Sequence, residues 1–351
     1  MPHTAQPQMM GIGNVILDKQ LTLSQADIIK RVVSMGFAEN SMNLINNNTA
    51  NNIAGLFQWQ SQSSGGSVAN SMASVAALTR VFNGAAAARQ VIFHGLASKD
   101  AAAQQFTQSF AESGGTAQLV YHQWEKPAAD NNPAPTGQCF CFVNKDNGER
   151  TMLTNLGSNI FFHLKALDQI ALAKSTMIFL EGYLFDSQES KDAFTQLVRQ
   201  KNNGQKICLT LSDQFCVTRH GADFLQLINH GIDVVFANEA EIMALFHAPD
   251  FNQALAQAAQ LAPLVVVTRS EKGVVLCGRN QPSLTIAAEP NIKVKDTTGA
   301  GDQLAAGVIY GLAEGWPLER SARLGCFLAA QIITRWGARL PIDHNMLSSF
   351  R

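Results

Sequence analysis

The strongest constraint on the fold is a series of short apolar segments that alternate with helix-like segments in the C-terminal half of the chain. These segments, rich in Val, Ile, Leu and Phe, are residues 175–181, 207–211, 234–237 and 264–268. A strand that is apolar at successive positions is buried on both faces, and a helix between two such strands makes them parallel. The sequence therefore predicts an α/β fold, a three-layer α/β/α sandwich with a mostly parallel central sheet.

A second pattern interrupts this alternation. Residues 118–123, 136–144 and 150–155 are typical of short strands separated by turns, and Asp146-Asn-Gly148 is a hairpin signal. We expect a small discontinuous β lid inserted into the α/β body. The expected parts are a loose tail (1–10), the body (11–18, 65–117 and 156–351) and the lid (19–64 and 118–155).

Composition excludes several classes of protein. Apolar residues make up 46% of the 351 residues and charged residues 15%, which is typical of a globular chain. The net charge of -1 predicts no nucleic acid or anionic membrane partner. The chain shows no membrane-spanning apolar run and no signal peptide pattern, so we expect a cytoplasmic protein. Its six cysteines have no zinc-type spacing, and Cys139 and Cys141 are expected to be buried thiols on one strand face.

One stretch carries the strongest chemical signal, Lys295-Asp-Thr-Thr-Gly-Ala-Gly-Asp302. Residues 291–295 alternate like a half-exposed strand, and residues 303–312 are typical of a buried helix. A glycine turn at a helix start can direct backbone N–H groups into one anion site, which the helix dipole reinforces. A neighbouring Asp302 could then take a proton from an alcohol during phosphoryl transfer. The alternative is a glycine turn in which Asp302 only starts the helix.

Asp296-Thr-Thr-Gly-Ala-Gly-Asp302 resembles the C-terminal signature of the PfkB (ribokinase-like) carbohydrate and nucleoside kinases. The resemblance implies that Asp302 is the catalytic base and that Gly299, Ala300 and Gly301 form the anion hole. It also implies ATP-dependent transfer of the γ-phosphoryl group to a primary hydroxyl. Other motifs follow in the family's order, so the resemblance extends from Gly11 to Arg339.

Two N-terminal motifs concern the acceptor. Residues 11–18 are typical of a buried strand that ends in a carboxylate, and the glycine pattern of a dinucleotide site is broken by Ile16. Residues 63–70 place paired glycines before an Ala-rich helix that runs to residue 80. The alternatives are a strand-end Asp facing water and a simple turn. The resemblance implies that the acceptor is bound by Asn14, Asp18, Gly65, Gly66, Ser67 and Asn70.

Two further motifs concern the nucleotide. Asn238 and Glu241 lie where a strand turns into a helix, and they match a motif that organises phosphate and metal-bound water in the family. A carboxylate oxygen suits Mg²⁺ with waters retained, although helix capping is an equally good physical explanation. Thr268 and Gly273 would approach ATP in a loop where this chain has Ser270 in place of the family's usual glycine. The resemblance also allows a K⁺ site near residues 322–339.

The acceptor is expected to be a nucleoside, with adenosine converted to AMP as the first choice. The residue after the paired glycines is the small Ser67, as in the adenosine-kinase-like branch, and not the Lys usual in ribokinase-type sugar kinases. Apolar lid residues could cover a flat base: Met42, Phe140 and Phe142. Arg150 could reach a phosphate or be solvated. The alternatives are a kinase of ribose, fructose or a related sugar, and a non-catalytic nucleotide- or sugar-binding protein. We expect a monomer or a homodimer.

Overall fold

The computed structural model describes residues 8–84, 87–121, 134–279 and 281–350. A nine-stranded sheet forms the centre of the body, in the order β14-β13-β12-β11-β10-β9-β1-β5-β6. The strands from β12 to β6 are parallel, and β13 and β14 add an antiparallel edge. The strands are β1 (Gln8–Ile12), β5 (Val91–Ala97), β6 (Thr116–Tyr121), β9 (Ser175–Glu181), β10 (Lys206–Thr210), β11 (Val234–Asn238), β12 (Leu264–Thr268), β13 (Val274–Gly278) and β14 (Gln281–Ile286).

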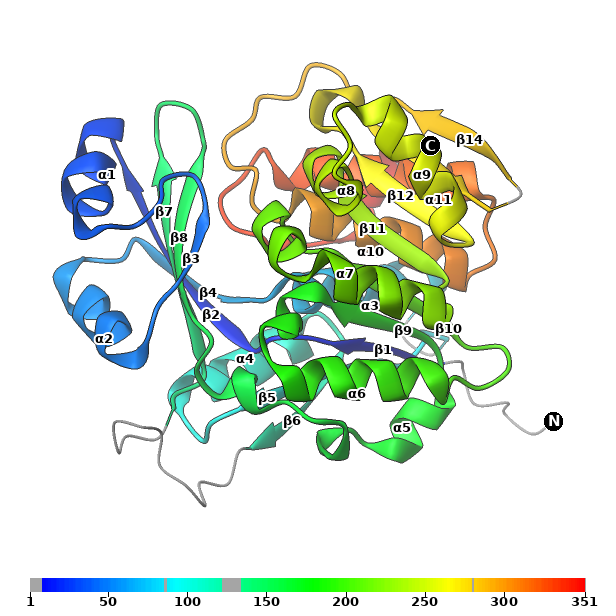
Figure 1. Ribbon diagram of the computed structural model, residues 1–351, viewed down its shortest axis with the longest axis horizontal. Coiled ribbons are helices and arrows are strands. Elements are labelled where there is room, and N and C mark those ends of the chain that lie inside the picture. The colour runs from blue at the N-terminus through cyan, green and yellow to red at the C-terminus, as the bar shows by residue number, and fades with distance from the viewer. Residues whose placement is uncertain (1–7, 85–86, 122–133, 280, 351) are drawn as a thin grey trace.

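Helices cover both faces of this sheet (Figure 1). Successive strand residues point to opposite faces, so Met10 and Ile12 pack in one apolar cluster and Met9 packs in the other. The first cluster includes residues of α5 (Gln169–Lys174), α6 (Gln188–Arg199), α7 (Gln214–Gly231), α8 (Glu239–Phe246) and α9 (Phe251–Leu261). The second includes residues of α3 (Ser67–Asn83), α4 (Ala101–Glu112), α10 (Ala300–Ala313) and α11 (Leu318–Ile332). The predicted three-layer sandwich is confirmed, and α12 (His344–Ser348) closes the described chain.

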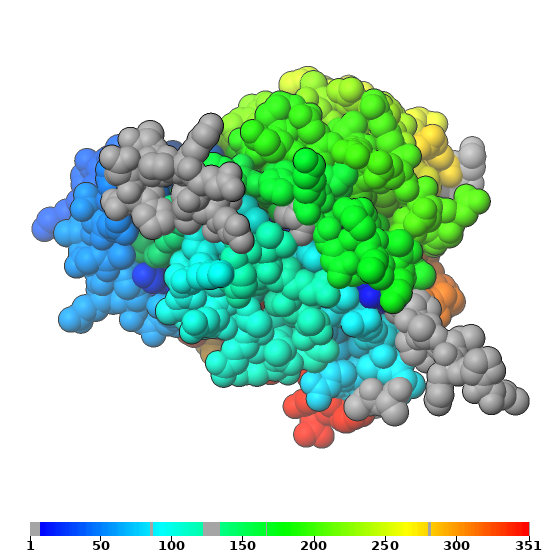
Figure 2. Space-filling model, turned by 90° about the horizontal axis from the view of Figure 1, so that it is seen from below, coloured from blue at the N-terminus to red at the C-terminus, as the bar shows by residue number. Residues whose placement is uncertain are grey.

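A second, five-stranded sheet stands beside the body, in the order β3-β8-β7-β2-β4. We call this sheet and the two helices on its outer face the lid. Seen from below, the blue surface of its N-terminal part lies at one end of the molecule (Figure 2). The lid consists of β2 (Ile16–Leu23), β3 (Met42–Leu44), β4 (Ser61–Gly65), β7 (Gly137–Asn144), β8 (Arg150–Asn155), α1 (Gln25–Arg31) and α2 (Asn47–Leu56).

The strand expected at 118–123 does not belong to the lid. It is β6, which pairs in parallel with β5 at the edge of the body sheet. An edge strand is only half covered, so its alternating pattern was easy to mistake for that of a lid strand. Residues 122 and 123 lie outside the described residues. The lid's remaining strands and the hairpin at Asp146-Asn-Gly148 agree with the prediction.

Three other expectations are wrong. Residues 8–10 are part of the buried strand β1 and not of a loose tail, while 1–7 lie outside the described residues. Residues 11–18 are not one strand, because the chain leaves the body sheet after Ile12 and enters the lid at Ile16. Residues 291–295 form no strand. Their end is held instead by the turn after α11, since the Lys295 amide donates to the Ile333 carbonyl (2.7 Å).

Candidate active site

The site lies where the order of the parallel strands reverses. From β1 the chain proceeds to β5 and β6 on one side, whereas β9 to β12 extend on the other. Ligands of open α/β sheets bind at such a switch point, beyond the carboxyl ends of the strands. Here the end of β1 is followed by Asn14 and β9 ends in Glu181. The acids Glu181, Asp213 and Glu241 lie at or near this edge.

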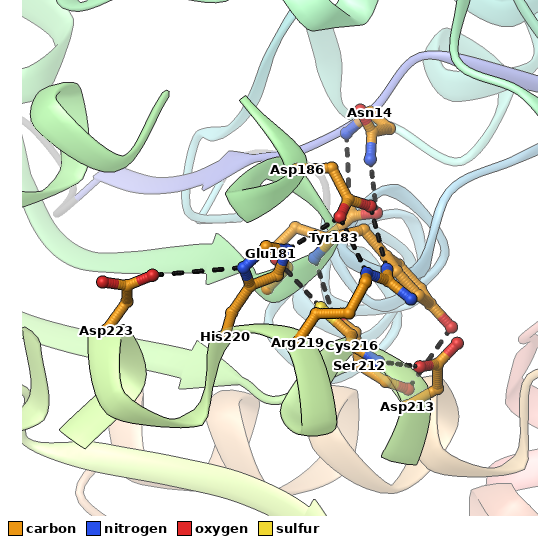
Figure 3. A network of polar contacts seen from close by, with 11 residues as sticks. Asn14, Glu181, Tyr183, Asp186, Ser212, Asp213, Cys216, Arg219, His220 and Asp223 are labelled. Carbon is orange, nitrogen blue, oxygen red and sulfur yellow. Dashed lines mark hydrogen bonds and ion pairs between the residues drawn. The ribbon is translucent and has the colours of Figure 1, made fainter. Parts of the chain in front are cut away.

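Glu181 is a member of the site that sequence reasoning missed. The Asn14 amide donates to its Oε2 (3.1 Å) and Asn14 Nδ2 donates to its Oε1 (3.3 Å), as Figure 3 shows. A Cβ on Gly13 would lie 2.1 Å from Oε2, which explains the glycine at the point where the chain leaves the sheet. Burial raises the pKa of Glu181 to about 8, and the nearby charge of Asp302 acts in the same direction. Its position at the end of a predicted strand was the only signal.

The predicted glycine turn opens α10 as expected. Gly299 is the N-cap and has a φ of +81°, which favours glycine, and a Cβ there would lie 2.8 Å from the Ala338 Cα. Asp296 closes the turn by accepting from the Thr298 amide (2.9 Å) and the Gly337 amide (2.9 Å). Apart from the backbone of its own helix and its chain neighbours, no described atom lies within 4 Å of the Cβ position of Gly301, which is exposed. The backbone of this turn is therefore open to an approaching ligand, as an anion hole requires.

Asp302 lies in the first turn of α10 and faces the first turn of α3. Ser67 Oγ donates to Asp302 Oδ1 (2.7 Å), and Asn70 Nδ2 donates to Oδ2 (2.9 Å). Burial raises the pKa of Asp302, and these two hydrogen bonds oppose that effect. The prediction placed Ser67 and Asn70 on the acceptor, whereas the structure shows them holding the predicted base. Gly66, the N-cap of α3, has a φ of +94°, and a Cβ there would lie 2.4 Å from the Asn14 carbonyl oxygen.

Asp18 approaches the same place from the lid. Its carboxylate lies against Gly65, where a Cβ would be only 2.1 Å from Oδ2. Burial raises the pKa of Asp18 to about 7; the charges of Arg339 and Arg150 lower it, and that of Asp302 raises it. The structure thus brings together the residues predicted to bind the acceptor and the predicted base, and it adds the cation of Arg339. The charge of Arg150 on β8 lowers the pKa of Asp18 and opposes the raised pKa of Asp302.

The strand register of the lid corrects one prediction. Asp18 pairs with Cys139, and Gln20 pairs with Cys141, so these side chains share the face toward the body. Gln20 Nε2 on that face donates to Asp296 Oδ2 (3.2 Å). Phe140 and Phe142 point the other way and cannot cover a base bound beside Asp18. They pack under the outer layer of the lid, with ring-centroid distances of 5.2 Å from Phe140 to Trp59 and 4.9 Å from Phe142 to Phe57.

The register also places Met42 and the two cysteines of the lid. Met42 pairs with Met152, which in turn pairs with Cys141, so both methionines lie on the face toward the body. Cys139 and Cys141 are buried free thiols, as expected. On β3, β7 and β8 this face therefore carries the sulfur-bearing side chains, while the two phenylalanines of β7 lie on the opposite face.

The residues predicted for the nucleotide lie on neighbouring strands. Asn238 ends β11 directly opposite Thr268, the end of β12. A cavity of about 680 Å³ is lined by both residues and by Glu239, Arg269 and Ser270. Ser270 has a φ of +49°, the conformation that the family's usual glycine adopts more easily. Gly273 has a φ of +86°, and a Cβ there would lie 2.0 Å from the Ile286 carbonyl oxygen.

Glu241 and Asn238 form a capping box at the start of α8. The Asn238 amide donates to Glu241 Oε2 (3.0 Å), and the Glu241 amide donates to Asn238 Oδ1 (2.8 Å). Asn238 Nδ2 donates to the other carboxylate oxygen (2.6 Å). Glu241 is 4% exposed, and burial raises its pKa to about 8, with the nearby Asp213 acting in the same direction. The pair thus caps α8, as the alternative explanation from the sequence predicted.

Asp213 is a second acid that the prediction missed. It caps α7 by accepting from the Cys216 amide (2.6 Å), and it lies beside the Tyr183 hydroxyl, which donates to the neighbouring Ser212 carbonyl (3.4 Å; Figure 3). Its charge affects Glu241, which places two carboxylates near the ends of β10 and β11. Among the described residues, no three His, Cys, Asp or Glu side chains are grouped to hold a metal by themselves. Any divalent cation here would need oxygens from a phosphate or from water.

Comparison with known proteins identifies the family. The family described as "pfkB family carbohydrate kinase" matches residues 30–345. The chain belongs to this family. Its members are kinases that phosphorylate hydroxyl groups and use ATP, so this chain is a phosphotransferase with an alcohol group as acceptor.

Individual relatives of this kinase point to the adenosine-kinase-like branch. The adenosine kinase of Saccharomyces cerevisiae is 27% identical over 269 residues, which cover 73% of this chain and 75% of the relative. A cytidine kinase of Thermococcus kodakarensis is 37% identical over 123 residues, 33% of this chain and 42% of that protein. The crystal structure of adenosine kinase from Sinorhizobium meliloti superposes with a TM-score of 0.85 at 31% identity, over 97% of both chains. No helix in the described part of the kinase is long and apolar enough to cross a membrane.

Proposed function

We propose that this kinase transfers the γ-phosphoryl group of ATP to the primary hydroxyl of a nucleoside, with adenosine and AMP as the first candidate substrate and product. One observation carries the assignment: Asp302 follows the glycine turn directly, accepts a hydrogen bond from Asn70, and lies close enough to Asp18 for the two charges to interact. The named relatives include adenosine kinases and a cytidine kinase, which supports a nucleoside acceptor.

Unsatisfied polar atoms support an acceptor with several hydroxyl groups. Asn14 Oδ1 and Asn70 Oδ1 are buried and have no hydrogen-bond partner among the described residues. Buried carbonyl oxygens are normally satisfied, so each is available to accept from a hydroxyl of a bound ligand. The Asp18 carboxylate can accept from two neighbouring hydroxyls at once. These three acceptors suit a ribose ring better than a ligand with a single alcohol.

Asp302 would remove the proton of the acceptor hydroxyl. The hydrogen bonds from Ser67 and Asn70 stabilise its ionised form, which is the form that can take the proton of the acceptor hydroxyl. The backbone N–H groups of Gly299, Ala300 and Gly301 would stabilise the charge on the transferred phosphoryl group. In this role Ser67 and Asn70 both orient the base, and Asn70 also keeps one oxygen free for the acceptor.

ATP would be bound along the ends of β11 and β12, by Asn238, Thr268 and the loop that ends at Gly273. Mg²⁺ fits beside Glu241 only through water, because both carboxylate oxygens already accept from Asn238. The cation would neutralise phosphate charge. We propose K⁺ as an activator bound near residues 322–339, the segment whose Gly337 amide donates to Asp296. We also propose that the enzyme is cytoplasmic, acts as a monomer or homodimer, and has no nucleic acid or membrane partner.

Specificity for a base would come from the lid. The small Ser67 leaves room beside the ring, and the lid face toward the body presents Met42, Met152, Cys139 and Cys141. Thioether and thiol groups pack well against flat rings. A pfkB-type kinase of ribose, fructose or a related sugar is the second candidate, favoured by the family's description.

The test is a comparison of kcat/KM for adenosine, inosine, guanosine, ribose and fructose under one set of conditions. We expect adenosine to be the best acceptor and both free sugars to be poor. A preference for either sugar over all three nucleosides would refute the nucleoside assignment and leave the kinase assignment intact.

A further inference from the structure

Arg339 is a charged group at the site to which the mechanism above gives no role. Its backbone belongs to the segment that supports the glycine turn of α10. The Ala338 Cα lies 2.8 Å from where a Cβ of Gly299 would be, and Gln303 Nε2 donates to the Ala338 carbonyl (3.1 Å). The Gly337 amide is held by Asp296. The position of Arg339 along the chain is therefore tied to the turn that would bind the phosphoryl group.

The side chain of Arg339 connects this turn to the acceptor side. Nε donates to the Ser64 carbonyl (3.3 Å), one residue before Gly65, against which the Asp18 carboxylate packs. The guanidinium carbon lies 5.8 Å from the centre of the Phe110 ring. Arg339 thus links the two glycine turns, one before α3 and one before α10.

The charge of Arg339 acts on both acids of the site. Both terminal nitrogens are shielded from solvent and have no hydrogen-bond partner among the described residues. Burial lowers the pKa of Arg339 to about 10, while Asp18 and Asp302 oppose that effect. A charge buried without a direct ion pair costs stability, so a functional reason for it is expected.

We propose that Arg339 is a positioning residue of this kinase, whose guanidinium keeps the carboxylates of Asp18 and Asp302 ionised and in place for phosphoryl transfer. The inference rests on the proposed function. Without a nearby cation, a buried carboxylate takes up a proton and can neither accept from two hydroxyls nor act as a base.

Other charged groups face the same two acids. Asp302 interacts with Asp18 on β2, Glu181 on β9 and Arg150 on β8, while Asp18 also faces the thiols of Cys139 and Cys141 on β7. Asp302 repels both Asp18 and Glu181, whereas Arg150 and Arg339 supply positive charge that stabilises the ionised forms of Asp18 and Asp302, and Ser67 and Asn70 add hydrogen bonds to Asp302. Arg150 is on the lid, whereas Arg339 is anchored in the body. Arg339 therefore supplies positive charge from the side that also carries the base.

The test compares Arg339→Met, Arg339→Lys and the control Arg335→Met, which removes an exposed arginine from the same turn. For Arg339→Met we expect the acid limb of the kcat/KM profile to move to higher pH by ~1–3 pH units, the effect of removing an arginine beside a carboxylate. Arg339→Lys should restore most of the wild-type profile, and Arg335→Met should not change it. An unmoved acid limb in folded Arg339→Met would overturn the proposal.

A second readout needs no substrate. Both acids have pKa values raised in the folded state, so they reduce the free energy of unfolding as the pH rises above their unfolded values, near 4. Without the cation this loss should be larger and continue to higher pH. Arg339→Met should therefore lose stability relative to wild type between pH 5 and pH 8, and much less so at pH 4. Parallel stability curves would contradict the proposal.

The two failures are distinguishable. If the wild-type protein phosphorylated no nucleoside or sugar, the proposed function would fail, and the stability curves would still test Arg339. If Arg339→Met does not fold, Arg339→Gln replaces it, because Gln keeps a donor for the Ser64 carbonyl without the charge.

Discussion

Asp302 and Glu241 occupy the same position in two helices, the third residue of α10 and of α8, yet the structure uses them differently. The N-cap of α8 is Asn238, whose amides take both oxygens of Glu241 in a capping box. The N-cap of α10 is Gly299, which has no side chain to exchange hydrogen bonds. Asp302 turns instead to Ser67 and Asn70 of another helix. In these two helices, the N-cap residue thus determines whether the acid accepts hydrogen bonds within its own helix or from residues of the site.

The difference has a functional consequence. Glu241 is 4% exposed and is satisfied within its own helix turn, so it can influence a bound cation only through water. Asp302 is partly exposed and lies next to the open backbone of Gly301. An acid that contacts the reacting hydroxyl should be needed for turnover. An acid that reaches the cation only through water should instead change the affinity for that cation. Three predictions test this contrast.

The largest effect is expected at Asp302. We expect Asp302→Asn to fold and to bind ATP, because Asn has the same shape and can keep the hydrogen bond from Ser67. Turnover should fall by ~10²–10⁴-fold, the usual contribution of a general base. The measurement is kcat with saturating adenosine, with ATP affinity determined by calorimetry as the control. Turnover near that of wild type would place Asp302 in the same class as Glu241, as a helix-start residue only.

A smaller effect is expected at Asp18. Asp18→Ala should weaken binding of the acceptor and leave ATP binding unchanged, since Asp18 lies on the lid against Gly65. A hydrogen bond to a charged group contributes ~1.5–3 kcal/mol, or roughly 10- to 150-fold in affinity. Direct titration with adenosine and with ATP separates the two. Lost ATP affinity with unchanged adenosine affinity would show that the orientation of the site is reversed.

The smallest effect is expected at Glu241. We expect an absolute requirement for a divalent cation and a several-fold higher half-maximal Mg²⁺ concentration for Glu241→Gln, with kcat recovered at saturating Mg²⁺. The matched control is Glu319→Gln, which removes an exposed acid from the first turn of another helix, α11, where it pairs with Arg323 (2.8 Å). A Mg²⁺ titration identical to that of wild type would remove Glu241 from the cation site.

The pH dependence of stability provides a further check on Glu241. Its pKa is raised to about 8 in the folded state, so it contributes stability below its ordinary value of 4.5 and loses it as the pH rises toward 8. Glu241→Gln has no such titration. Without Mg²⁺, the difference in the free energy of unfolding between this variant and wild type should therefore change in favour of the variant, by ~1 kcal/mol or more, as the pH rises from 5 to 8. An unchanged difference across this range would show that Glu241 is not buried as described.

Local patterns were sufficient for part of this protein. The parallel strands β9 to β12, the glycine turn, the helix that places Asp302 in its first turn and the Asn238–Glu241 pair were all predicted from neighbouring residues. A strand buried on both faces and a helix start are determined by a few consecutive side chains, so the sequence contains the information directly.

Tertiary structure decided the rest, because the contacts join residues far apart in the chain. Ser67 and Asn70 lie 235 and 232 positions from Asp302, and no local pattern indicates that they would bond to it. Glu181 and Arg339 joined the site only because two neighbouring strands end together and two glycine turns pack nearby. Strand β7 is buried at nearly every position, so alternation could not show which face Phe140 and Phe142 occupy until pairing with β2 set the register.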